Sequence, residues 1–134
     1  KKWMKNMIET GQAVQFIIWE QSTSKKIGSV YLRDIDHKNK KAEFGIFIGE
    51  KECCGKGYGR EAAEIITEYA FSVLCLNKVF LRVLSYNERA YRSYLRAGFK
   101  QEGFFKADVY VDDKPLDVIF MAKFSEICGE EMDE

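Results

Sequence analysis

Apolar runs bounded by polar segments predict three consecutive β-strands in the first third of the chain. An apolar run within Ala13–Glu20 predicts the first strand, and the polar segment Gln21–Lys26 predicts the turn that follows it. Further strands are predicted over Ile27–Asp34 and Ala42–Ile48. Short polar turns between such strands are typical of antiparallel neighbours, so this region is expected to start a sheet.

Helical spacing of apolar residues occurs at three places. Four apolar residues recur at intervals of three and four within Lys1–Glu9, which predicts a short amphipathic helix. They are Trp3, Met4, Met7 and Ile8. A longer apolar stripe after Gly59 predicts the clearest helix of the chain. It comprises Ala62, Ile65, Ile66, Tyr69, Ala70, Val73 and Leu74. A third helix is predicted between an N-cap at Asn87 and Gly98, a residue type common just after helix ends.

The remaining apolar segments predict strands. Lys78–Leu84 is apolar on both alternating faces apart from Arg82, which predicts a central strand covered on both sides. Phe99–Phe124 predicts two strands about a turn at Asp112–Pro115, with Gly103 at a bulge. Three strands followed by alternating helices and strands indicate an α/β (α+β) fold, a mixed sheet with helices packed on its faces.

The composition is that of one globular domain over residues 1–134, with an acidic tail at 125–134 that is expected to fray. The 21 basic and 21 acidic residues balance, so net charge directs the chain to neither nucleic acid nor a membrane surface. No apolar run approaches the ~20 residues of a membrane span. Four cysteines without C-x-x-C spacing accompany a single histidine, His37, so no metal site is expected. Free thiols favour a reducing compartment, the cytoplasm.

A glycine-rich segment, Cys54–Arg60, lies between the strand that ends at Ile48 and the long helix. Glycines allow a sharp turn and close approach of the backbone, and the free N–H groups of a helix N-terminus favour an anion such as a pyrophosphate. The segment matches neither the phosphate loop of nucleotide hydrolases nor the dinucleotide fingerprint. By itself it is more often a tight connection than a ligand site.

A second block of residues makes the function of the glycine-rich segment more specific. This block consists of Asn87, Ala90, Tyr94, Gly98 and Phe99 in the spacing N-x-x-A-x-x-x-Y-x-x-x-G-F. The loop and the block together resemble the GCN5-related N-acetyltransferase (GNAT) family over Ile27–Phe124. The residues of both motifs are most similar to the branch that includes ribosomal-protein N-terminal acetyltransferases. The resemblance implies a mixed, mostly antiparallel central sheet with helices on both faces.

The chain departs from the family pattern at two points. Cys54 stands where the family's loop motif carries Gln or Arg, so one side-chain contact to the phosphates is expected to be absent. The family's fold also opens with a strand and a helix before the equivalent of Val14, and only one short helix is expected here. The chain is therefore expected to be N-terminally short, with an acceptor site that is incomplete or built differently.

The resemblance implies acetyl-CoA as the donor and assigns residues to its binding. The pyrophosphate would lie on the loop, formed by Gly55, Lys56, Gly57, Tyr58, Gly59 and Arg60. Backbone groups around Phe47 and Ile48 would pair with the pantetheine arm, where the family's sheet splays open. Asn87 would bind the pantetheine amides, although a simple helix N-cap explains it equally well.

The family's chemistry is the transfer of acetyl to a primary amine by direct attack, and it assigns two catalytic residues. Tyr94 occupies the position of the family's general acid, which protonates the departing thiolate; its alternative role is a core tyrosine. Glu43 is the candidate general base, because it begins the strand that leads to the thioester; its alternative is a solvated charge.

Two other functions stay open at this stage. A CoA-binding or catalytically inactive domain would keep the loop and lack a complete acceptor site. A nucleotide-phosphate binder would use the same loop for a different ligand. The acceptor is equally open among a protein N-terminus, an amino sugar, a polyamine and an antibiotic amine, and a homodimer stays open as the assembly.

Overall fold

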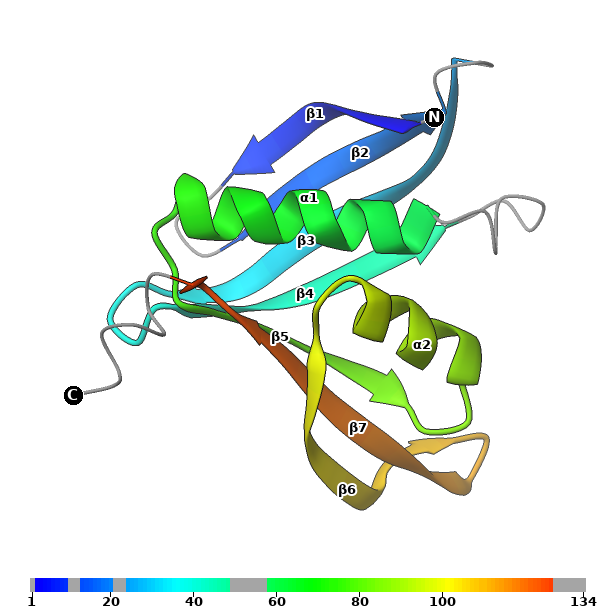
Figure 1. Ribbon diagram of the computed structural model, residues 1–134. Helices are drawn as coiled ribbons and strands as arrows, with labels where there is room; N and C mark the ends of the chain where they lie inside the picture. Colours follow the sequence, from blue (N-terminus) through cyan, green and yellow to red (C-terminus); the bar gives the residue numbers. More distant parts are fainter. Residues whose placement is uncertain (1, 10–12, 21–23, 49–57, 127–134) are drawn as a thin grey trace.

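The computed structural model describes residues 2–9, 13–20, 24–48 and 58–126. They form seven strands and two helices, which Figure 1 labels in chain order. The elements are β1 (Lys2–Glu9), β2 (Val14–Glu20), β3 (Lys25–Asp36), β4 (Lys41–Ile48), α1 (Tyr58–Ser72), β5 (Lys78–Leu84), α2 (Glu88–Arg96), β6 (Lys100–Val111) and β7 (Lys114–Phe124).

All seven strands belong to one sheet in the order β1-β2-β3-β4-β5-β7-β6. Every neighbouring pair is antiparallel except β4 and β5, which are parallel and are joined through α1. A parallel pair needs a crossover connection, and the long apolar stripe of the sequence supplies it as a helix. The prediction of a mixed, mostly antiparallel α+β sheet is confirmed.

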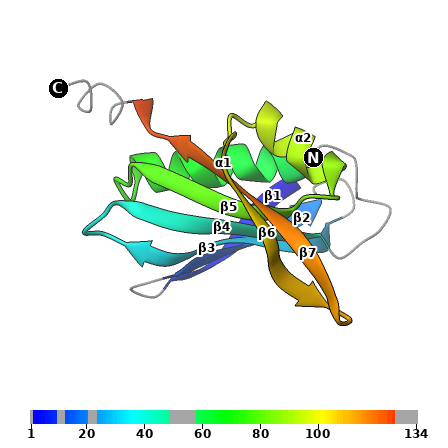
Figure 2. The ribbon, with the colours of Figure 1, turned by 90° about the horizontal axis from the view of Figure 1, so that it is seen from below.

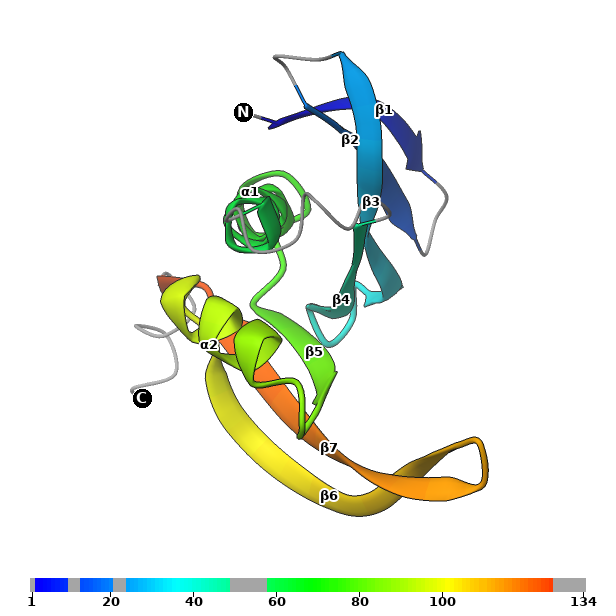
Figure 3. The same ribbon diagram turned by 90° about the vertical axis from the view of Figure 1, so that its right-hand side faces the viewer.

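Within the described residues, α1 and α2 both lie on the same face of the sheet, and the sheet curves around them (Figures 2 and 3). The prediction of helices on both faces is therefore wrong for this part of the chain. The same holds for Lys78–Leu84, which is central but covered on one side. Its Val79, Leu81 and Val83 are buried toward the helices, while Arg82 is exposed on the opposite face.

The core lies between α1 and the strands beneath it. Ala62, Ile66 and Ala70 of α1 are fully buried together with Val30 and Leu32 of β3. Full burial of a side chain such as Ile or Leu is worth roughly 1.5–3 kcal/mol, so this layer fixes α1 on the sheet. Two members of the predicted stripe, Ile65 and Val73, are instead 41% and 60% exposed, so the buried face is narrower than the pattern indicated.

The first segment is a strand, so the predicted helix over Lys1–Glu9 is wrong. β1 pairs antiparallel with β2 and its register shifts between Met4, opposite Ile18, and Met7, opposite Phe16. The interval between these two pairs is three residues on β1 and two on β2, so β1 carries one extra residue, as in a β-bulge. An interval of three between apolar residues is also the interval of a helix, and the bulge accounts for the misreading.

β4 and β5 separate along their length, and this separation positions the site. They pair only from Lys41 opposite Lys78 to Glu43 opposite Phe80. Beyond Glu43 the two strands diverge (Figure 1), and the rest of β4 has no partner on its β5 side among the described residues. The strand splay that the family resemblance implied is present.

Local signals in the second half of the chain behave as predicted. The Asn87 side chain accepts a hydrogen bond from the Ala90 N–H at 3.2 Å and caps α2. Gly98 follows that helix with φ of +104°, a conformation that favours glycine. The β6–β7 register shifts at Gly103, which confirms the predicted bulge. No helix in the described ranges is long and apolar enough to cross a membrane.

Candidate functional site

A cavity of about 360 Å³ lies where β4 and β5 diverge. Tyr94 of α2 lines it together with apolar residues from the helix-covered side of the sheet. Glu43 of β4 and Arg82 of β5 line it from the open side, with Tyr31 and Arg33 of β3 beside them. The splay thus brings both predicted catalytic residues to one cavity.

Tyr94 is held by aromatic packing rather than by hydrogen bonds. Its ring meets Phe44 edge-on with centroids 5.8 Å apart and Phe99 at 6.0 Å. In the described part of the chain its hydroxyl has no hydrogen-bond partner, and it is not among the buried polar atoms that lack one. The hydroxyl is therefore open to the cavity, whereas a buried core tyrosine usually has a partner for its O–H.

The electrostatic setting of Tyr94 keeps its hydroxyl protonated. Burial raises the pKa of Tyr94 to about 12, and the nearby Tyr31 adds to the shift. The phenol accordingly carries its proton throughout the physiological pH range. Its ring is fixed and its O–H faces a cavity, so Tyr94 is arranged to donate a proton to a group bound there.

Glu43 is buried and ion-paired. Arg82 donates from Nε to Glu43 Oε2 at 2.7 Å and from Nη2 to Oε1 at 3.3 Å. Arg33 donates from Nε to the same Oε1 at 3.4 Å. The solvated-charge alternative for Glu43 is excluded by its burial, because its side chain is only 7% exposed. Both oxygens accept hydrogen bonds from arginines, so taking up an amine proton would require those contacts to loosen.

Gly45 and Tyr31 form a part of the cavity that sequence reasoning missed. The two residues are paired across β3 and β4, and a side chain on Gly45 would overlap the Tyr31 ring. The ring therefore lies across the backbone of β4 at the splay. A glycine inside an otherwise apolar strand was the available signal, because such glycines often mark close approach of another group.

The described residues assigned to cofactor binding lie at one end of the molecule, where β4 ends and α1 and α2 begin (Figure 1). Gly55, Lys56 and Gly57 lie outside the described residues, and α1 begins at Tyr58. Gly59 faces α2, where a Cβ built on it would lie 3.8 Å from Ser93 Oγ. Arg60 is exposed and pairs with Glu64 at 3.2 Å.

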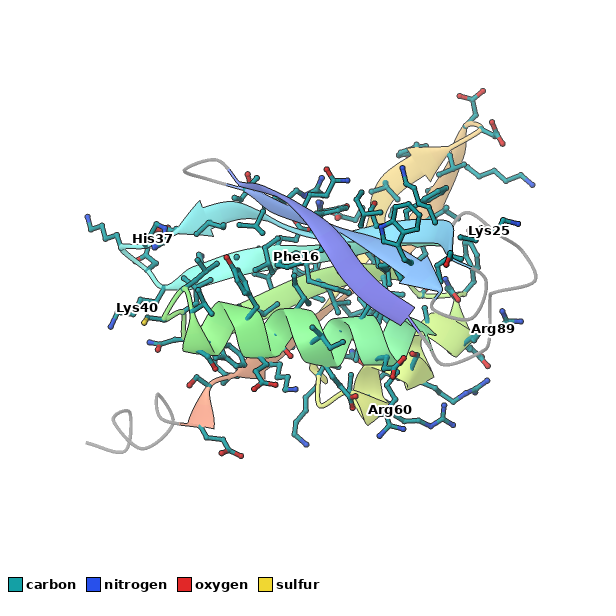
Figure 4. The ribbon with its side chains drawn as sticks, turned by 90° about the horizontal axis from the view of Figure 1, so that it is seen from above. Phe16, Lys25, His37, Lys40, Arg60 and Arg89 are labelled. Carbon is teal, nitrogen blue, oxygen red and sulfur yellow. The ribbon has the colours of Figure 1, made fainter. Side chains whose placement is uncertain are left out.

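Figure 4 shows Arg60 of α1 and Arg89 of α2 at one end of the molecule, with His37 and Lys40 at the other. Arg89 is exposed and was not singled out from the sequence. It lies two residues after the N-cap Asn87, whose own side chain is exposed and occupied in capping α2. Two arginines beside two helix N-termini make this end suited to an anionic group.

Phe47 and Ile48 end β4 beyond the splay. The Phe47 side chain is 65% exposed. Among the described residues this stretch of β4 pairs with β3 alone, so its other edge offers backbone N–H and C=O groups to an extended ligand. Backbone pairing of Phe47 and Ile48 with a pantetheine arm stays a prediction.

Comparisons with known proteins identify the family. A family model described as an acetyltransferase (GNAT) domain matches residues 1–100. Spermidine N(1)-acetyltransferase of Escherichia coli (strain K12) is 36% identical over 100 residues, which cover 75% of this chain and 53% of that protein. YdaF of Bacillus subtilis (strain 168), named as a candidate ribosomal N-acetyltransferase, is 34% identical over 93 residues, 69% of this chain and 50% of that protein. The chain thus spans about half the length of the curated relatives it matches.

The solved structures agree. Spermidine N-acetyltransferase from Vibrio cholerae, in complex with CoA and spermine, superposes with a TM-score of 0.79 at 29% identity. The match covers 85% of this chain and 66% of that one. The relatives include both spermidine and candidate ribosomal acetyltransferases, so they do not single out the ribosomal branch. The chain belongs to the GNAT acetyltransferase domain family.

Proposed function

We propose that this protein is an acetyl-CoA-dependent N-acetyltransferase that acts on a primary amine by direct transfer. The observation that carries the proposal is the position of Tyr94 in the cavity between the diverging strands β4 and β5, where its hydroxyl has no hydrogen-bond partner among the described residues. Acetyl-CoA supplies the thioester. The chain's own residues have to hold that donor, admit the amine and provide a proton.

Three features support donor binding at this site. The edge of β4 after Glu43, which no described strand pairs on the β5 side, offers backbone groups for an extended arm. The N-terminus of α1, together with the glycine-rich sequence Gly55, Lys56 and Gly57 before it, suits a pyrophosphate. Tyr58, Gly59 and Arg60 open that helix, and Asn87 begins the neighbouring one. We assign these residues to the cofactor site.

The proton balance of the reaction defines the role of Tyr94. A bond forms from the amine nitrogen to the carbonyl carbon, the carbon–sulfur bond breaks, and sulfur leaves with the electron pair. Sulfur then takes up one proton, and the amine nitrogen loses one to water. Tyr94 donates its hydroxyl proton to the sulfur and regains one from solvent. We expect this step to contribute about 10²-fold in rate, the usual size for a positioned acid.

Glu43 has a different part in this proposal from the one first predicted. Its two oxygens are held by Arg82 and Arg33, so we propose that it sets the positions of the two arginines at the cavity wall. A base role through a bridging water stays a prediction. The two roles separate in kinetics: loss of a base alters the pH dependence of kcat, whereas loss of an anchor changes stability and KM.

The assay that tests the proposal is thiol release from acetyl-CoA in the presence of primary amines. We expect release that depends on the amine and saturates with it. CoA binding without release for any amine would favour a CoA-binding domain with an incomplete acceptor site. Better protection from heat by ATP than by CoA would favour a nucleotide-phosphate binder, and either result would overturn the proposal.

Relatives give context for acceptor, assembly and location. Spermidine is the substrate named for the Escherichia coli and Vibrio cholerae relatives, and one Vibrio cholerae structure is described as dodecameric. We propose that this chain also acts as an oligomer, with a homodimer as the smallest candidate assembly. Cys75 is a free thiol, which supports the cytoplasm as the proposed location.

A further inference from the structure

The open face of the sheet at the splay carries a cluster of three charged side chains. Arg33 comes from β3, Glu43 from β4 and Arg82 from β5, and all three line the cavity that contains Tyr94. Among the described residues that line the cavity, these are the ones with a formal charge at neutral pH. Two positive groups face one negative group, so the part of the cavity wall that the structure describes is positive by one charge.

The hydrogen bonds show where that excess charge lies. Arg82 binds both oxygens of Glu43, at 2.7 and 3.3 Å, and the two groups neutralise each other. Arg33 reaches Glu43 with Nε alone, at 3.4 Å. Within the described residues, the two terminal nitrogens of Arg33 have no hydrogen-bond partner. These nitrogens form a planar set of donors beside the cavity, of the shape that binds carboxylate or phosphate.

Arg33 is held in place from a second side. Its guanidinium carbon lies 5.4 Å from the centroid of the Tyr31 ring, within the range of a cation–π contact. Tyr31 in turn lies across Gly45, which has no side chain to displace it. The Arg33 side chain remains 46% exposed, so its free nitrogens are accessible to a ligand while its position is restricted.

We infer that the acceptor is a primary amine that also carries an oxyanion, a carboxylate or a phosphate, which Arg33 binds. This inference rests on the proposed acetyltransferase function and names its substrate class. The anionic group would lie at Arg33 and the amine would enter the splay toward Tyr94. A polyamine has no group for Arg33 to bind, and its several positive charges would be repelled by that guanidinium.

Matched pairs of acceptors test the inference on the unmodified chain. Glucosamine 6-phosphate is compared with glucosamine, and β-alanine with propylamine, with spermidine as the polycation. Each is measured by calorimetry in the presence of CoA and by thiol release from acetyl-CoA. The charged member of at least one pair should bind roughly tenfold or more tightly than its partner, since hydrogen bonds to charged groups are the stronger kind. The pair that responds distinguishes phosphate from carboxylate.

A variant assigns the preference to Arg33. Arg33→Gln should remove most of the difference within the responding pair, because the affinity for the charged member falls far more than the affinity for the uncharged one. Arg92→Gln is the matched control, because Arg92 is also an exposed arginine paired with a glutamate, Glu88, and does not line the cavity. It should keep the full preference. Melting temperatures of both variants establish that the comparison is made on folded protein.

Each remaining outcome has a defined meaning. Equal affinity within both pairs, or tighter binding of spermidine than of any oxyanion-bearing amine, would overturn the inference. Thiol release with equal rates within the pairs would overturn it while leaving the proposed acetyltransferase function intact. Preferential binding of a charged member without any thiol release would support the anion site at Arg33 and overturn the proposed acetyltransferase activity.

Discussion

Arg82 Nε lies 2.7 Å from Glu43 Oε2, and this contact joins β5 to β4 just beyond the point where the two strands stop pairing. Glu43 is opposite Phe80, and Arg82 follows two residues later on the same face of β5. The ion pair therefore spans the start of the splay. It fixes how far the strands have opened at the wall of the cavity.

A double-mutant cycle measures this contact. Glu43→Gln should lower the free energy of unfolding by about 2 kcal/mol, less than for a fully buried pair because Arg82 is 42% exposed. Arg82→Gln should cost less, and the two changes together less than the two separate losses, with a coupling of about 1 kcal/mol. Chemical denaturation of the four proteins gives these values.

The exposed pair Arg92–Glu88 on α2 is the control for that cycle. Its atoms lie 3.5 Å apart and its side chains are 59% and 76% exposed, so its coupling should stay below about 0.5 kcal/mol. A coupling at Glu43–Arg82 no larger than this control would show that the pair does not hold the strands together.

Gly59→Ala separates a requirement of the ligand from a requirement of the fold. A Cβ at this position meets Ser93 Oγ at 3.8 Å, an ordinary contact, so the fold should accept alanine with unchanged or slightly higher stability. CoA binding should nevertheless weaken, by roughly tenfold or about 1.4 kcal/mol, because the added methyl group stands at the helix N-terminus assigned to the pyrophosphate. Calorimetry with CoA and a thermal melt provide the two readings. Unchanged CoA affinity would remove Gly59 from the cofactor site.

Local patterns predicted the parts of the fold that depend on local physics. The cap at Asn87 and the turn at Gly98 follow from what those two residues do to their own backbone. The strand β1 was missed because a bulge places apolar residues at a helical interval. Coverage of the sheet by helices on one face depends on how separate elements pack, which no local pattern contains.

The residues that line the cavity likewise fall into those that the sequence predicted and those that it did not. Tyr94 and Glu43 were predicted from the family motif and from a position before the splay. Arg33 was missed because it meets Glu43 only through the register of β3 with β4, a contact between strands. Arg82 had a visible signal, since it is the one charge within the apolar part of its strand, but the partner that explains it is 39 residues away in the sequence.

The pH dependence of transfer follows from the raised pKa of Tyr94. With a pKa of about 12 instead of 10.0, Tyr94 stays protonated, so kcat should not fall with rising pH between about pH 7 and about pH 9.5. It should rise as more of the amine becomes neutral. The raised pKa also affects stability, because the folded protein holds this proton more tightly than the unfolded chain does. Below pH 10.0 both states are protonated and Tyr94 causes no change in the free energy of unfolding with pH. As pH rises from 10.0 toward about 12, the free energy of unfolding falls.

A pH–rate profile with a falling limb near pH 9 that is absent from Tyr94→Phe would contradict this assignment. Such a limb would mean that the phenol loses its proton in the open cavity far more readily than its burial indicates. The profile has to be measured at saturating amine, so that changes in amine binding do not enter kcat.

The most direct test of the account is the pair of measurements, kcat and melting temperature, on Tyr94→Phe. The substitution keeps the ring that packs on Phe44 and Phe99 and removes a hydroxyl that has no hydrogen-bond partner in the described part of the chain. Stability and CoA affinity should therefore hardly change, while kcat falls by ~10²-fold, about 2.7 kcal/mol of barrier. A variant that turns over acetyl-CoA at the unmodified rate would contradict the account, whatever its melting temperature.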